Sequence, residues 1–91
     1  MEYDMSQFGN NITSCETAKR ISNDILKLLN TNAAVSLDFS KINLMTTTAA
    51  KEILIPIVNR HGINNVFKKI HFCNVADDLK IVISTAIDSF N

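Results

Sequence analysis

The stretch VSLDFSKINLMTTTAA, Val35–Ala50, contains the change of pattern that decides the fold. Its first part, from Val35 to Phe39, alternates apolar and polar residues, which is the two-residue period of a strand with one apolar face. After it, apolar residues recur at helical spacing, and they are Ala50, Ile53, Leu54, Ile57 and Val58. The stretch therefore predicts a strand that leads into a helix beginning near Met45 to Thr48.

Three consecutive threonines, Thr46, Thr47 and Thr48, lie at the predicted start of this helix. In open α/β sheets, functional residues collect at the carboxyl ends of strands and at the helix N-termini beside them. One threonine is enough to cap the helix, so we expect the other hydroxyls to be exposed beside the positive end of the helix dipole. A phosphate group placed there would find free N–H donors, and the threonines are therefore candidate phospho-acceptors.

Two elements are predicted before this stretch. A short strand is predicted within Tyr3–Gly9, with Tyr3 and Met5 on one face. A helix then begins at a capping box formed by Thr13 and Glu16. The buried stripe of this helix is Ala18, Ile21, Ile25, Leu28 and Leu29.

The helix that follows the threonines contains a proline, and a further strand comes after it. Pro56 lies well inside the helix, where it is expected to kink the axis or loosen one turn. The helix is expected to stop at His61–Gly62. A loop through Asn64–Asn65 is then predicted to lead to a strand at Lys69–Asn74.

The last helix has the clearest pattern in the chain. Its apolar residues recur at helical spacing, and they are Leu79, Val82, Ile83, Ala86, Ile87 and Phe90. Asn74 with Asp77 or Asp78 offers a capped start that carries negative charge, as helix N-termini favour.

This order of strands and helices predicts one small α/β domain over residues 1–91, with a mostly parallel sheet of three to four strands. The two clearest strands alternate apolar and polar residues, whereas a strand buried on both faces would be apolar throughout. We therefore expect the helices mainly on one face of the sheet. The less protected face, a candidate partner or dimer surface, would present Ser36, Asp38, His71 and Cys73.

Charge and hydropathy limit the classes of partner. Nine basic and nine acidic residues cancel, and no basic run extends beyond Lys68–Lys69, so we expect no nucleic-acid binding. No apolar run approaches 18 residues, and the first ten residues have no apolar segment typical of a signal peptide. These features predict a cytoplasmic protein without a membrane span, in which Cys15 and Cys73 are free thiols.

Asp38 and Ser40 stand at the end of the central strand and have two interpretations. They could take part in catalysis, but a carboxylate at a strand end more often bonds the N–H groups of the following loop. We therefore favour a structural or partner-binding role for both residues. An enzyme that uses Asp38 with His71 or Cys73 is the least favoured alternative, and we expect no catalytic residue.

The cysteines and histidines suggest a metal site only weakly. His71 and Cys73 share one strand face, and His61 and Cys15 could in principle join them in a zinc site. No CxxC or HxxxH spacing is present, however, and a chain with two glycines has no glycine-rich phosphate loop. The sequence therefore predicts no metal and no cofactor.

The central stretch resembles the STAS domain of bacterial anti-sigma factor antagonists, and it looks closer still to the STAS-like domains of uncharacterised bacterial regulators. In the antagonists, a strand of the form hydrophobic-Asp-hydrophobic-Ser leads to a Met-Asp-Ser-Ser-Gly-type turn. A partner ATPase, which is both kinase and anti-sigma factor, phosphorylates the first serine of that turn. Asp38 and Ser40 match the strand end, Met45 matches the turn, and Thr47 falls on the phospho-acceptor with Thr48 after it.

The resemblance implies a regulatory protein-interaction module. Its implied partner is an ATPase of the histidine-kinase-like class, and phosphorylation at Thr47, or secondarily at Thr48 or Thr46, would break the contact. This chain differs from the antagonists in having Thr46 in place of the acidic residue of the turn and Ala49 in place of its glycine. The expected partner-binding residues are Asp38, Ser40, Met45, Ala49 and Ala50. The alternative is a constitutive scaffold or homodimer subunit in which the threonines only cap the helix.

Overall fold

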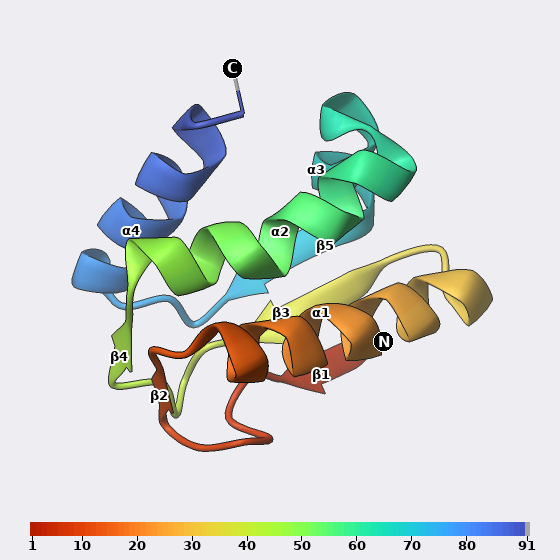
Figure 1. Ribbon diagram of the computed structural model, residues 1–91. Helices are drawn as coiled ribbons and strands as arrows, with labels where there is room; N and C mark the ends of the chain where they lie inside the picture. Colours follow the sequence, from red (N-terminus) through yellow and green to blue (C-terminus); the bar gives the residue numbers. More distant parts are fainter. Residues whose placement is uncertain (91) are drawn as a thin grey trace.

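The structure, a computed structural model, describes residues 1–90, and Figure 1 shows how its strands and helices are arranged. The strands are β1 (Glu2–Asp4), β2 (Asn11–Ile12), β3 (Val35–Asp38), β4 (Leu44–Met45) and β5 (Ile70–Cys73). The helices are α1 (Cys15–Thr31), α2 (Thr47–His61), α3 (Ile63–Lys69) and α4 (Asp77–Asp88). The predicted α/β class is confirmed.

A three-stranded parallel sheet of order β1-β3-β5 positions the rest of the chain. Its register pairs Leu37 of β3 with Tyr3 on one side and with Phe72 on the other. β2 and β4 form a separate parallel pair. Helices α1, α2 and α4 lie over the same side of the three-stranded sheet (Figure 1), as the alternating strands predict.

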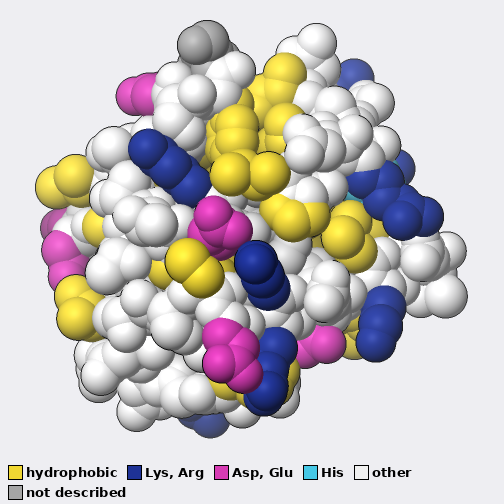
Figure 2. Space-filling model, viewed as in Figure 1, with side chains coloured by type: hydrophobic (Ala, Val, Ile, Leu, Met, Phe, Trp, Pro, Cys, Tyr) yellow, Lys and Arg dark blue, Asp and Glu magenta, His cyan; other side chains and the backbone are white. Residues whose placement is uncertain are grey.

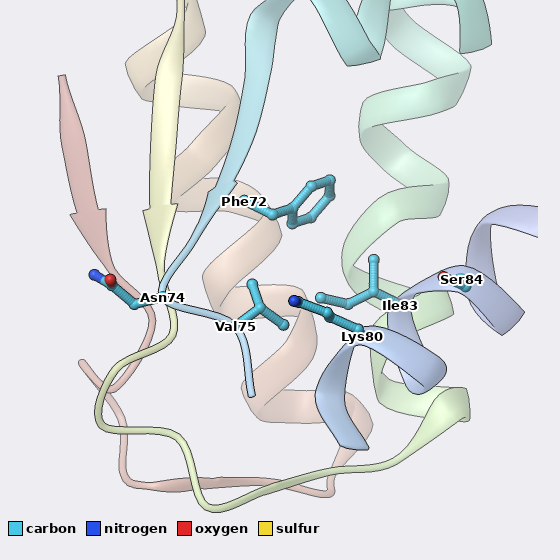
Figure 3. Close-up of a pocket in the computed structure, with 6 residues that line it drawn as sticks. All are labelled: Phe72, Asn74, Val75, Lys80, Ile83 and Ser84. Atoms are coloured by element: carbon cyan, nitrogen blue, oxygen red, sulfur yellow. The ribbon is translucent and has the colours of Figure 1, made fainter. Parts of the chain in front are cut away.

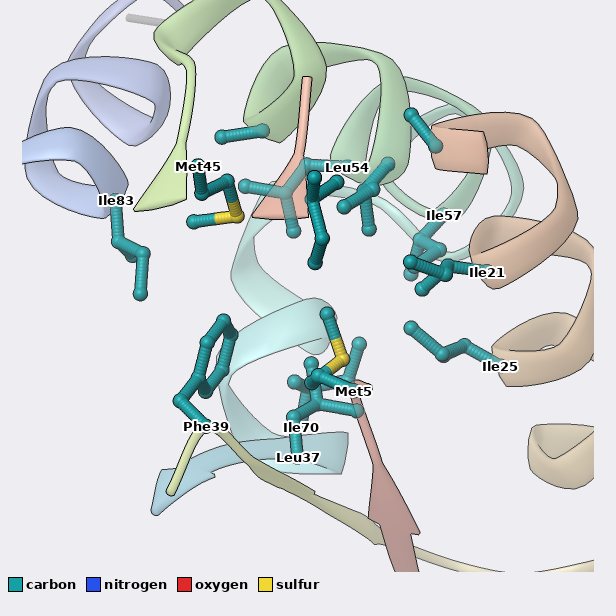
Figure 4. Packing of buried hydrophobic residues seen from close by; sticks show 14 of the residues in the cluster. Met5, Ile21, Ile25, Leu37, Phe39, Met45, Leu54, Ile57, Ile70 and Ile83 are labelled. Carbon is teal, nitrogen blue, oxygen red and sulfur yellow. The ribbon is translucent and has the colours of Figure 1, made fainter. Parts of the chain in front are cut away.

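The core lies between the sheet and these helices. Val35 and Leu37 of β3 are at most 1% exposed, whereas Ser36 and Asp38, which alternate with them, are only half-buried. Figure 4 shows the buried side chains of the sheet pointing toward those of the helices. The labelled residues in that view include Leu37 and Ile70 from the sheet, Ile21 and Ile25 from α1, and Leu54 and Ile57 from α2.

The predicted capping box at the start of α1 is wrong. Ser14 is the N-cap, and its hydroxyl accepts a hydrogen bond of 3.2 Å from the N–H of Thr17. Glu16 instead accepts a 3.0 Å bond from Arg20, one helical turn later. Ile12, the last residue of β2, pairs with Met45 of β4, so Thr13 is an extended link and the helix begins after Ser14.

The predicted loop after α2 is also wrong, because Ile63–Lys69 forms α3. Gly62 ends α2 as expected, with a φ of +82° that favours glycine. Val66 is 1% exposed and anchors α3 to the core, while the Asn65 side chain donates to the carbonyl of His61 at 2.9 Å. Tertiary packing therefore stabilises a helix of seven residues that would be marginal alone.

α4 begins without the predicted asparagine cap. Its N-cap is Ala76, which makes no side-chain capping bond, although Asp77 and Asp78 occupy the first turn as expected. Asn74 adopts a left-handed conformation with a φ of 55° and directs its side chain to Asp38 instead. In the described part of the chain, no helix combines the length and apolar character needed to span a membrane.

Candidate functional site

The carboxyl ends of the three parallel strands and the first turn of α2 lie at the same end of the molecule, on the left of Figure 1. This is the arrangement that places functional residues at strand ends and helix starts in open α/β sheets. The candidate site therefore has two parts. One is the threonine-bearing start of α2, and the other is a polar cluster where β1, β3 and β5 end.

Thr46 fixes the start of α2. Its hydroxyl oxygen accepts a 3.1 Å hydrogen bond from the N–H of Ala49, which makes it the N-cap. Its own N–H donates to the carbonyl of Ile12 at 3.1 Å, which ties the helix start to β2. The prediction that one of the three threonines caps the helix is confirmed, and the hydroxyl that does so is already engaged.

Thr47 and Thr48 occupy the first two positions of the helix, and neither side chain caps it. Thr47 is half-buried and Thr48 is exposed. The first N–H groups of a helix lack intrahelical acceptors, and within residues 1–90 neither hydroxyl makes a hydrogen bond. The first turn of α2 also contains no acidic residue, all of its positions being described. The site thus offers two hydroxyls beside the positive end of a helix dipole.

The residues that flank the threonines lie inside the fold. Met45, Ala49 and Ala50 are 3%, 1% and 3% exposed and belong to the hydrophobic core. Their side chains therefore lie behind the expected partner surface and not on it, because Met45 of β4 and the apolar face of α2 both point into the core. These three buried residues position the threonines. Leu44, which precedes Met45, is 52% exposed.

Asp38 organises the end of the central strand. Its carboxylate accepts hydrogen bonds from the side-chain amide of Asn74 at 3.0 Å and from the N–H and hydroxyl of Ser40 at 3.0 and 3.2 Å. The bond from Asn74, followed by those from Ser40, lowers the pKa of the Asp38 carboxyl. Asp38 therefore joins the loops after β3 and β5, which is the structural role that a carboxylate at a strand end favours.

The end of β1 repeats this arrangement, and sequence reasoning missed it. Asp4 lies opposite Asp38 in the sheet and accepts bonds from the N–H and hydroxyl of Ser6 at 2.9 and 2.7 Å. Lys41 lies 3.9 Å from the Asp4 carboxylate. The bonds from Ser6 lower the pKa of Asp4, with a smaller contribution from Lys41. The repeated pattern of Asp, a hydrophobic residue and Ser was the signal that could have revealed it.

The comparisons with known proteins place the chain in a family. The family model described as "STAS-like domain of unknown function (DUF4325)" matches residues 17–80, well over half of the chain. The chain belongs to this STAS-like family. It has no significant match among curated proteins or among solved structures. The family match covers β3, the start of α2, β5 and the first residues of α4, and therefore most of the candidate site.

The second face of the sheet is open in this STAS-like domain, as predicted. Two cross-strand rows lie on it, with Ser36 between Glu2 and His71, and Asp38 between Asp4 and Cys73. Glu2 and His71 are exposed, whereas the other four residues of the two rows are half-buried. Within residues 1–90, no helix covers this face.

The cysteines and histidines of the STAS-like domain are not gathered into one site. Cys15 begins α1 and His61 ends α2, whereas His71 and Cys73 lie on β5. Among the described residues, no group of three side chains of the metal-ligating types lies close enough to hold an ion. Burial is the main cause that lowers the pKa of His61, and the positive charges of Lys69 and Arg60 lower it further. The Lys69 amine lies 3.5 Å from the ring nitrogen Nδ1 of His61.

The helical face of the STAS-like domain is mixed in character. Figure 2 shows hydrophobic side chains gathered over the region where α4, α2 and α3 approach one another. The large exposed hydrophobic residues of these helices are Ile55, Phe67 and Ile81. Acidic and basic side chains are both present on the face shown, so its charge is not of one sign.

Proposed function

We propose that this STAS-like domain is a non-enzymatic regulatory module that binds a partner protein through the surface around the start of α2. Phosphorylation of Thr47, or secondarily of Thr48, releases the partner. The partner is an ATPase of the histidine-kinase-like class that acts as the kinase. The observation that carries the proposal is that Thr46 alone caps the helix, which leaves two hydroxyls unengaged beside it.

The electrostatics at this site suit a phosphorylation switch. A phosphate adds about 1.5 to 2 negative charges at neutral pH and three strong acceptor oxygens. At positions Thr47 and Thr48 it meets free N–H groups and the positive end of the α2 dipole, so the domain itself tolerates the charge. A partner packed against this surface would instead have to desolvate the phosphate, and any acidic group on it would be repelled. The modification therefore weakens binding without unfolding the module.

The surface around the threonines supplies the rest of the contact. Ser40 and Leu44 are exposed, and Asp38 is half-buried at the end of β3. Leu44 provides an apolar contact, whereas Asp38 and Ser40 are tied to each other and determine the loop shape. A partner that uses ATP as phosphoryl donor also places the proposed activity in the cytoplasm, where ATP is available.

Phosphate mapping tests the proposal directly. The protein is incubated with ATP and the ATPase encoded beside it in its genome, and phosphopeptides are identified by mass spectrometry. We expect phosphate on Thr47 or Thr48, and its loss in the variant Thr47→Ala combined with Thr48→Ala. Lys51→Ala, in the next turn, is the matched control and should keep the phosphate. Absence of phosphate from all three threonines would reject the switch.

The open sheet face favours a second candidate function. A constitutive scaffold or homodimer could use Ser36, His71 and their neighbours as its interface, because that face carries no helix within residues 1–90. In that case Thr47→Asp would leave assembly unchanged, since an acidic residue is favourable at a helix start. Sedimentation velocity of wild type, Thr47→Asp and His71→Glu separates the two functions, because only the scaffold loses assembly in His71→Glu.

A further inference from the structure

The sheet has two edges, which differ in charge. Within residues 1–90, β1 and β5 are the outer strands, and each has β3 as its neighbour. β1 carries Glu2 and Asp4 among its three residues, whereas β5 contains no acidic residue, lysine or arginine. Pairing β1 with β1 of a second copy would place carboxylates beside carboxylates, which is unfavourable. β5 is therefore the edge that permits self-pairing.

The backbone of β5 offers one complete bonding position on its outer side. The carbonyl of Cys73 accepts a bond from the N–H of Phe39, so Cys73 points toward β3. Because successive residues of a strand direct their backbone groups to opposite sides, the N–H and C=O of Phe72 point outward, and neither has a partner in the described chain. The N–H of Ile70 donates instead to the carbonyl of Val66. Phe72 is thus the residue at which a second strand can exchange two hydrogen bonds.

These free groups determine the register of a two-fold pair of strands. In an antiparallel ladder, two residues directly opposite each other can exchange both N–H···O=C bonds. With Phe72 opposite Phe72 of a second copy, His71 lies opposite Cys73 of that copy. Lys68–Lys69 then come next to the segment that leads into α4 of the second copy.

Charge favours this antiparallel arrangement. Between Glu52 and Asp77 the chain has no acidic residue, and Lys68–Lys69 make no ion pair within residues 1–90. Figure 2 shows Lys and Arg side chains gathered near a histidine on the side of the molecule where α3 lies. The first turn of α4 carries Asp77 and Asp78, and Lys80 offsets only one of them, through a 3.7 Å contact with Asp77. Antiparallel pairing therefore brings the lysines of each copy toward an acidic helix start of the other, whereas parallel pairing would place lysines beside lysines.

Apolar surface lies along the same edge. A hollow of about 580 Å³ separates β5 from α4, and Figure 3 shows the Phe72 ring extending toward α4 with Ile83 across the hollow. Phe72 and Val75 are half-buried, and Ile83 is 7% exposed. In the antiparallel pair the two Phe72 rings lie opposite each other, and aromatic cross-strand pairs are favourable. Phe67 of α3 and Ile81 of α4, which are 41% and 69% exposed, lie on the elements that approach each other between the two copies.

We propose that the chain forms a two-fold dimer in which β5 pairs antiparallel with β5 of a second copy, so that one sheet runs through both copies. The Phe72 backbones exchange hydrogen bonds, and Lys68–Lys69 of each copy lie near the first turn of α4 of the other. This interface is the edge of the sheet and not its open face. It adjoins the candidate site at Asn74, which lines the hollow and bonds Asp38, and it does not depend on phosphorylation.

Cysteine cross-linking tests the register. One chain carries Cys15→Ser, Cys73→Ser and His71→Cys, and the other carries Cys15→Ser alone, so that its remaining thiol is Cys73. We expect mild oxidation of the mixture to link the two different chains by a disulfide, because opposite residues at this ladder position have Cα atoms about 4.5 Å apart. In the matched control Glu2→Cys replaces His71→Cys, since Glu2 is also exposed and lies in the same cross-strand row at the opposite edge. The control should not cross-link to Cys73.

Sedimentation equilibrium measures the dimer and its dependence on charge. Wild type should form a dimer whose fraction rises with protein concentration. Because a two-fold dimer contains every contact twice, Lys68→Glu combined with Lys69→Glu should weaken dimerisation about tenfold. Lys19→Glu combined with Lys27→Glu, which makes the same charge change on exposed positions of α1, is the matched control and should keep the wild-type dissociation constant. Equal effects of the two pairs of substitutions would contradict the proposed contact.

Amide exchange locates the interface. Exchange of the Phe72 N–H should slow as the protein concentration rises, whereas the N–H of Asp4, at the other edge, should exchange at a constant rate. The proposal is overturned by a chain that stays monomeric at every concentration, by a dimer that leaves Phe72 unprotected, or by cross-linking no stronger from position 71 than from position 2. Thr47→Asp should dimerise as wild type does, so failure here leaves the phosphorylation proposal standing.

Discussion

Asp38 shows how one carboxylate can connect distant parts of a small fold. It sits at the end of the middle strand, and its partners Ser40 and Asn74 come from the loops after β3 and β5. Asn74 adopts a left-handed backbone to reach it, a conformation that asparagine tolerates better than most residues. Asp38, which the resemblance to the antagonists singled out, therefore also determines the conformation of the loops around the candidate site.

The lowered pKa of Asp38 predicts a dependence of stability on pH. Its hydrogen bonds favour the charged form, so the folded pKa lies below the ordinary value of 3.8. The resulting stabilisation is present above the unfolded pKa and is lost as the pH falls through the folded pKa. As the pH is lowered below 3.8, we expect the free energy of unfolding to decrease less steeply for Asp38→Asn than for wild type.

Urea unfolding between about pH 7 and pH 2 measures this difference. Asp88→Asn, which removes a carboxylate from the exposed end of α4, controls for the general effect of losing one negative charge. Identical acid slopes in wild type and Asp38→Asn would show that the bonds from Asn74 and Ser40 do not persist in solution.

Ser22 is a second residue with a defined expectation. It lies on α1 with no exposed surface, and its hydroxyl has no hydrogen-bond partner in the described chain. An unpaired buried hydroxyl destabilises a fold, and alanine is a better helix former than serine. We therefore expect Ser22→Ala to leave the free energy of unfolding unchanged or raise it by up to about 1 kcal/mol. A loss of more than about 1 kcal/mol in thermal or urea unfolding would indicate that the hydroxyl has a partner.

At the scale of elements, the start of α2 depends on one cap. Thr46→Ala removes the bond to the N–H of Ala49, and we expect a loss of about 0.5 to 2 kcal/mol of stability. Thr46→Ser should retain most of the stability, since serine caps equally well. Thr48→Ala is the matched control and should change stability by less than about 0.5 kcal/mol, because Thr48 is exposed and makes no capping bond. Chemical denaturation of the three variants checks the order, and equal losses in Thr46→Ala and Thr48→Ala would contradict it.

The elements that the sequence predicted share a strong periodic pattern. β3, α2 and α4 were predicted because their apolar residues follow one period over several positions. Most of these residues are buried in the core, and Val58, Val82, Ile87 and Phe90 are partly buried against it. α3 was missed because its short sequence contains two asparagines and a single buried anchor, Val66. The Ser14 cap was missed because Thr13 offers the same chemistry one residue earlier, and only the pairing of β2 decides between them.

At the scale of the whole molecule, the alternating strands predicted the open sheet face and the layer of helices on the other. The polar cluster at the strand ends was only half predicted, since it depends on the register that places Asp4 opposite Asp38. The core position of Met45, Ala49 and Ala50 could not be predicted from the motif, because the motif does not say which sides of β4 and α2 face the core. Burial therefore confines the expected partner surface to the threonines and the exposed loops beside them.

The central claim is that negative charge on Thr47, at the start of α2, releases the partner. One titration tests it. The partner ATPase is titrated calorimetrically with wild type, Thr47→Asp and Thr47→Asn. The aspartate and asparagine side chains have nearly the same shape and differ in charge. The account predicts that Thr47→Asp binds at least tenfold more weakly than Thr47→Asn, whereas Thr47→Asn stays within about threefold of wild type. Equal affinities for Thr47→Asp and Thr47→Asn would contradict it.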